Sequence, residues 1–146
     1  MKNNEKYIWP VFWAAMGIFI LVIAAIAMPS IKWFSQLVLV FWVLLVILGI
    51  VLLVLAIRSG FAKKLKVFLA LAGAALAAMP VFILLHGLVY GLLIKMFGEG
   101  FWGGAANSDE PFFFILALVV CPLAYAIGAA GSIYLMARMG QKAKQA

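Results

Sequence analysis

A chain of 146 residues in which 69% are apolar and 10% are charged has too much apolar surface to bury in a water-soluble domain of this size. The net charge of +7 comes from basic residues between long uncharged segments, so it indicates membrane topology rather than nucleic-acid binding. A single cysteine excludes an internal disulfide and any CxxC redox or zinc motif.

Four apolar segments are long enough to cross a hydrocarbon core of about 30 Å, which takes about 20 helical residues. None of them alternates in the manner of a membrane β-barrel strand. The sequence therefore predicts an all-α, polytopic integral membrane protein, a single domain over 1–146 with four transmembrane helices in an up-down bundle. The expected helices are residues 7–28, 35–57, 66–95 and 111–137.

The first two expected helices raise different questions. The first follows the basic stretch MKNNEK and contains AIA at 25–27, features that a secretory signal peptide shares, but we expect it to be retained as a transmembrane helix. In the second, Val, Ile and Leu fill 17 of the 21 positions from Leu37 to Ile57. Because so few of these residues are small, we expect this helix to face lipid or a partner's apolar surface rather than to approach another backbone closely.

Basic residues are distributed unevenly between the two ends of the expected bundle. With four spans, both termini and the middle loop share one side, which holds nine cations against two on the other. The connections are short enough for the positive-inside rule, so both termini are predicted to be cytoplasmic, in the plasma membrane and in contact with membrane lipids. The nine are Lys2, Lys6, Arg58, Lys63, Lys64, Lys66, Arg138, Lys142 and Lys144, and the two are Lys32 and Lys95.

Small residues form a stripe on each of the last two expected helices. Such stripes let two helix backbones approach closely, which drives association where the hydrophobic effect is absent. We expect these helices to pack as an antiparallel pair, although the same stripes also suit a homo-oligomer interface. Each helix also has a mid-span proline, Pro80 or Pro122, that removes a backbone hydrogen bond and favours a kink. The predicted packing residues are Gly73, Gly87, Gly91, Ala124, Gly128, Gly131 and Ser132.

The only histidine, His86, lies inside the third expected helix. If the third and fourth helices form a symmetric hairpin around the outer loop, His86 lies level with Cys121, with Tyr90 and Tyr125 each four residues further along. An ionisable group inside a membrane is a candidate functional site. These four residues are the candidate intramembrane polar site.

Several roles remain open for the candidate intramembrane polar site. A two-fold dimer would supply two His86 and two Cys121 ligands to a metal, whereas one chain supplies too few. His86 also suits a proton carrier, or a hydrogen-bonding group for a quinone or lipid headgroup. The simplest interpretation is a neutral imidazole bonded to Tyr90 or to a backbone carbonyl. No catalytic residue, metal or cofactor is expected.

The acidic residues point away from coupled transport, because all four lie outside the expected spans, at Glu5, Glu99, Asp109 and Glu110. This argues against a proton-coupled exchanger of the small multidrug type. No nucleophile–base–acid set or phosphate loop appears either. The leading hypothesis is a non-catalytic accessory or scaffolding subunit of a membrane complex. The alternatives are a small homo-oligomeric channel or transporter, with the last two helices and the glycine-rich loop near the path, and a redox or enzyme module for a lipophilic substrate.

Overall fold

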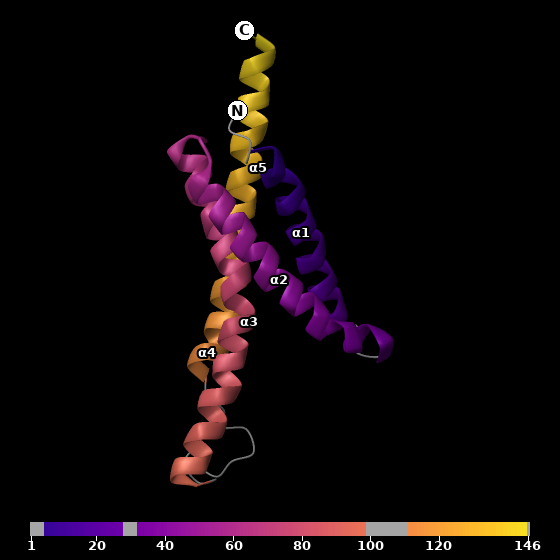
Figure 1. Ribbon diagram of the computed structural model, residues 1–146, viewed down its shortest axis with the longest axis vertical. Coiled ribbons are helices and arrows are strands. Elements are labelled where there is room, and N and C mark those ends of the chain that lie inside the picture. The colour runs from indigo at the N-terminus through magenta and orange to yellow at the C-terminus, as the bar shows by residue number, and fades with distance from the viewer. Residues whose placement is uncertain (1–4, 28–31, 99–110, 146) are drawn as a thin grey trace.

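The chain folds into helices alone over the residues that the computed structural model describes, 5–27, 32–98 and 111–145 (Figure 1). Four of these helices are long and apolar enough to cross a membrane, as the sequence predicted. The fourth is continuous along the chain but divided by one π-helical turn. The elements are α1 (Glu5–Ala27), α2 (Lys32–Arg58), α3 (Lys63–Phe97), α4 (Pro111–Ile115), the π turn η2 (Leu116–Val120) and α5 (Cys121–Gln145).

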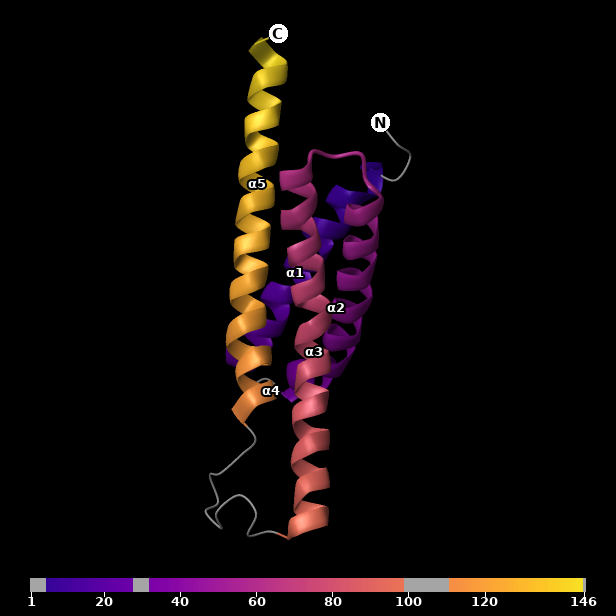
Figure 2. The ribbon, with the colours of Figure 1, turned by 90° about the vertical axis from the view of Figure 1, so that its left-hand side faces the viewer.

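The observed helices contain nearly all of the predicted ones and extend beyond them by up to a few residues, except at the C-terminus, where α5 runs to Gln145. The glycine-rich loop between the third and fourth expected helices, which the channel alternative places near the path, falls on residues 99–110, outside the described part of the chain. Helix α3 lies in the middle and packs on α2 and on α5, while α1 packs on α2. Figure 2 shows the start of α1, the α2–α3 connection and the end of α5 toward the same end of the molecule.

Helices α2 and α3 touch backbone to backbone at a pair of glycines. A Cβ on Gly49 would lie 2.7 Å from the backbone nitrogen of Ala77, and one on Gly73 would lie 2.7 Å from that of Leu53. Neither glycine can carry a side chain without moving a helix. The expectation that the second helix does not approach another backbone closely is therefore wrong, since one glycine suffices where its partner helix supplies another.

Helices α3 and α5 approach each other in the same way, closer to the start of α3. A Cβ on Gly128 would lie 2.7 Å from the backbone nitrogen of Ala72, and one on Gly131 would meet the ring of Phe68. Ser132 is fully buried beside them, and its hydroxyl donates to the carbonyl of Gly128 at 2.7 Å. This bond satisfies the hydroxyl within its own helix, so burying it leaves no unpaired donor.

Helix α1 is held by large side chains instead of glycines. One stripe of α1, spaced by threes and fours, is buried against the rest of the chain. The ring of Phe19 lies 4.5 Å from that of Tyr125 on α5, centroid to centroid. This ring contact joins α1 to α5, in addition to the packing of α1 on α2. The buried stripe is Ile8, Phe12, Ala15, Phe19 and Val22.

The two mid-span prolines have different surroundings. Pro80 lies within the uninterrupted α-helix α3, whereas Pro122 follows directly after the π turn η2. There the N–H of Cys121 bonds to the carbonyl of Leu116, five residues back. Proline has no N–H and its ring crowds the carbonyl four residues earlier, so a widened turn just before Pro122 relieves that contact.

Glu5 links the start of α1 to the connection between α2 and α3 by a hydrogen bond. Its side chain is buried, and Oε1 accepts a hydrogen bond from the Gly60 N–H at 3.0 Å. We expect Glu5→Ala to lower the free energy of unfolding by about 1 kcal/mol and to speed amide hydrogen exchange at Gly60. Glu5→Gln keeps an oxygen acceptor and is expected to recover most of the loss. Equal effects of the two variants would show that the hydrogen bond is not the source.

Candidate functional site

His86 lies in an aromatic contact between α3 and α4. Its ring stacks on that of Tyr90 one turn later, with centroids 6.5 Å apart and planes inclined by 23°. On the other side it meets the ring of Phe114 at 5.5 Å. One turn earlier, Phe82 of α3 and Phe113 of α4 pair at 6.2 Å. The imidazole is therefore part of the packing between two helices.

Cys121 and Tyr125 form a separate group near the middle of the molecule. Both are buried, and they follow each other by one turn on α5. The hydroxyl of Tyr125 is buried and, among the residues that the structure describes, has no hydrogen-bond partner. The four residues of the candidate intramembrane polar site thus divide into two pairs, His86 with Tyr90 and Cys121 with Tyr125.

The depth predicted for His86 differs from the one observed. A symmetric hairpin places His86 level with Cys121, but it meets Phe114, seven residues earlier and roughly 10 Å along the helix axis. The glycine crossing at Gly128 sets the register, and α3 continues well past the level at which α4 begins (Figure 2). Within one chain, the imidazole and the thiol do not meet, so a shared His–Cys metal or redox site is not formed there.

The predicted packing glycines of α3 also divide into two groups. Gly73 lies in the crossing with α2, but a Cβ on Gly87 or Gly91 would have no heavy atom within 4 Å in the part of the chain that the structure describes. Gly87 and Gly91 therefore do not pack against the described part of this chain, and the alternative that they belong to an interface between chains stays a prediction. The aromatic pairs between α3 and α4 stand at 5.5–6.2 Å and hold the two backbones apart at this level.

This part of α3 has no buried residue. All buried residues of α3 lie between Leu65 and Pro80, and from Val81 to Phe97, a range described in full, every residue is exposed or half-buried. Leu84 and Leu88 are 73% and 63% exposed. We call residues 81–97 the uncovered half of α3. It lies at the end of the molecule opposite the start of α1 and the end of α5 (Figure 1).

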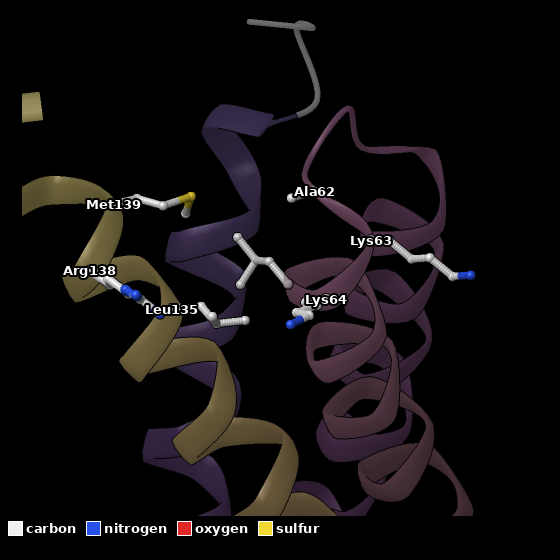
Figure 3. A pocket seen from close by; sticks show the side chains of 7 residues that line it. Ala62, Lys63, Lys64, Leu135, Arg138 and Met139 are labelled. Atoms are coloured by element: carbon white, nitrogen blue, oxygen red, sulfur yellow. The ribbon is translucent and has the colours of Figure 1, made fainter. Parts of the chain in front are cut away.

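A second feature lies at the end of the molecule that holds the termini. A cleft of about 470 Å³ opens between the start of α3 and the last turns of α5. Figure 3 shows Arg138 on the α5 wall and Lys64 on the α3 wall, with Lys63 extending away. We call it the basic cleft. Its lining residues are Ala62, Lys63, Lys64, Leu65, Leu135, Arg138 and Met139.

No acidic residue lines the basic cleft. Among the described residues the only acid is Glu5, whose carboxylate is buried and bonded to Gly60. The first turn of α3 also has no acidic residue, and Ala62 provides no side-chain cap. The first N–H groups of any α-helix have no intrahelical acceptor, and in α3 no side-chain cap supplies one. These N–H groups face the same end as the cations. From the sequence, the cations of the α2–α3 connection are expected to set the topology, with attraction of anionic lipid as the alternative, and no cleft between α3 and α5 is predicted.

Two apolar hollows lie further along the helices. One, of about 500 Å³, lies between α2 and α3 beside Pro80 and is bordered by Trp42, whose indole nitrogen is buried with no hydrogen-bond partner among the described residues. The other, of about 330 Å³, is bordered by Phe19, Met79 and Pro122. Because these linings are apolar, lipid acyl chains are the ligands that fit them in a membrane.

Comparisons of this chain with protein-family models, with curated proteins and with solved structures found no match.

Proposed function

We propose that this protein is a non-catalytic accessory or scaffolding subunit that presents the uncovered half of α3 to a transmembrane helix of a partner chain. The observation that carries the proposal is the open pair Gly87 and Gly91, four residues apart, with no heavy atom of the described residues within 4 Å of a Cβ at either position. Glycines at this spacing on a lipid-exposed face allow a second helix to approach closely.

The same chain shows what glycines do where a helix covers them. Gly49, Gly73 and Gly128 each lie against the backbone of a neighbouring helix. In a membrane, apolar surface alone does not favour contact with a helix over contact with lipid, because both are apolar. Close packing of backbones does favour such contact, and an open glycine allows it. A partner helix on the uncovered half of α3 would use Gly87 and Gly91 as α2 uses Gly73.

The proposed topology is an up-down bundle in the plasma membrane with both termini in the cytoplasm. It is supported by the cations whose side chains the structure describes. Six of them belong to the end with the termini and the α2–α3 connection, and one, Lys95, to the opposite end of α3. A bias of this kind follows the positive-inside rule. The six are Lys6, Arg58, Lys63, Lys64, Lys66 and Arg138.

Gly87→Leu tests the proposed interface. The new side chain has room within the chain, so the fold is expected to stay intact while a partner helix loses its close approach. Partner chains that co-purify with the wild type, measured by native mass spectrometry after gentle extraction from the native membrane, are expected to fall at least tenfold.

The matched control is Gly17→Leu on α1, where a Cβ also has no heavy atom within 4 Å. This variant adds the same side chain to an open helix surface and is expected to keep its partners. Co-purification that is unchanged in Gly87→Leu would contradict the proposal.

The alternative function is a small homo-oligomeric channel or transporter with the last two helices near its path. It is favoured by the polar pair His86 and Tyr90 on the same uncovered half of α3. The two functions differ in what occupies that surface. A wild-type complex that contains other chains supports the subunit, whereas an assembly of this chain alone supports the channel and makes His86 the first residue to substitute.

A further inference from the structure

We propose that the basic cleft binds the headgroup phosphate of an anionic glycerophospholipid. The cleft is distinct from the uncovered half of α3, since the two lie toward opposite ends of that helix. The inference rests on the proposed function only in assigning the cleft to the cytoplasmic leaflet, where anionic lipids concentrate.

The polar residues of the cleft fit a phosphate. Arg138 supplies a planar guanidinium with several donors, which bonds two phosphate oxygens at once, and Lys64 supplies a point charge from the facing wall (Figure 3). The uncapped start of α3, a helix of 35 residues, adds N–H donors and the positive end of the helix dipole. Among the described residues, no carboxylate lines the cleft to compete for these groups.

Apolar residues line both walls of the cleft beside the cations, which a lipid needs and a free phosphate does not. Ala62, Leu65, Leu135 and Met139 share the lining with the three cations. Leu65 is 1% exposed and belongs to the core, whereas Met139 is 44% exposed at the outer edge. A surface with cations beside hydrocarbon matches a molecule whose phosphate is joined to glycerol and acyl chains.

The cleft also lies at the depth where headgroups are found. The two candidate spans that form it run from Lys63 to Phe97 and from Phe112 to Met139. Its residues are therefore at the first turn of one span and the last turn of the other, where the hydrocarbon core gives way to the polar region of a bilayer. Both walls meet the same leaflet.

The test compares lipid binding to the full chain and to two double variants. Native mass spectrometry in detergent would titrate phosphatidylglycerol and, separately, phosphatidylcholine with the same acyl chains. We expect a preference for phosphatidylglycerol in the wild type and a loss of about 30-fold in Lys64→Gln/Arg138→Gln, from two cations near an anionic headgroup. The control Lys6→Gln/Arg58→Gln removes the same charge at the same end but outside the cleft, and is expected to bind nearly as the wild type does.

The outcomes separate the possible sources of binding. Equal losses in the two double variants would show attraction to the overall charge of this end and would overturn the site, as would no preference for phosphatidylglycerol over phosphatidylcholine. Glycerol phosphate that displaces the lipid at equal concentration would overturn the lipid as ligand, because the apolar residues would then contribute nothing. Because all four substituted side chains are at the molecular surface, unchanged thermal stability in both variants will show that folding is not the cause.

Discussion

Gly73→Leu is expected to force α2 away from α3 and to lower the free energy of unfolding by about 1–3 kcal/mol or more. The reason is that the atoms around Gly73 are backbone atoms. A Cβ there would lie 2.7 Å from the nitrogen of Leu53 and 2.8 Å from the carbonyl oxygen of Gly49, and neither can rotate away. Unfolding in mixed micelles with increasing dodecyl sulfate, followed by the fluorescence of the five tryptophans, would measure the change.

Gly87→Leu is the matched control for Gly73→Leu, because it places the same side chain on the same helix at an open position. Glycine within a helix costs about 0.8–1 kcal/mol relative to alanine, so this control is expected to be neutral or slightly stabilising. The comparison therefore sets a loss of unfolding free energy in Gly73→Leu against no loss in Gly87→Leu. Equal destabilisation by both variants would mean that the helix surface, and not the crossing with α2, determines the effect.

The helices could be predicted from the sequence because composition and length depend on each segment alone. Val, Ile and Leu from Leu37 to Ile57 require lipid or another helix around them whatever the fold. Gly128 lies in a crossing with α3, the pairing that the stripes predict, whereas Gly73 lies in a crossing with α2, which they do not predict. A stripe shows that close approach is possible along a helix, but not where along it the approach occurs.

The register between helices depends on contacts that no local pattern contains. His86 seemed level with Cys121 because the hairpin was assumed to be symmetric, whereas the crossing of Gly128 with Ala72 shifts the fourth helix by about two turns. That shift leaves Gly87 without a neighbour. It also brings Arg138 opposite Lys64, so the basic cleft is a consequence of the register and could not be read from either segment alone.

The two halves of helix α3 thus differ in their contacts. Its first half, to Pro80, carries every one of its buried residues and receives α2 on one side and α5 on another. Its second half meets α4 through the rings of Phe82 and His86, but among the described residues no helix lies against its glycines, Gly87 and Gly91. Substitutions in the first half are therefore expected to act on folding, and those in the second on assembly, so the two effects can be measured separately.

Gly128→Leu is expected to separate α5 from α3, with a loss of unfolding free energy similar to that of Gly73→Leu, about 1–3 kcal/mol or more. A Cβ at this position would lie 2.7 Å from the nitrogen of Ala72 and 2.8 Å from the carbonyl oxygen of Phe68, both backbone atoms. The shift would also move Arg138 relative to Lys64, so anionic lipid binding in the basic cleft is expected to fall together with stability. Dodecyl sulfate unfolding and lipid titration of the same preparation would measure both.

The neighbouring Gly131 provides the control for Gly128→Leu. The three atoms nearest to a Cβ there all belong to the ring of Phe68, a side chain that can change rotamer, so Gly131→Ala is expected to have a clearly smaller effect. Because Gly128 lies inside the chain's own core, loss of partner chains in Gly128→Leu cannot distinguish a broken interface from a broken fold, whereas Gly87→Leu can. If Gly128→Leu unfolded as the wild type does, the register that places both the basic cleft and the uncovered half of α3 would be wrong.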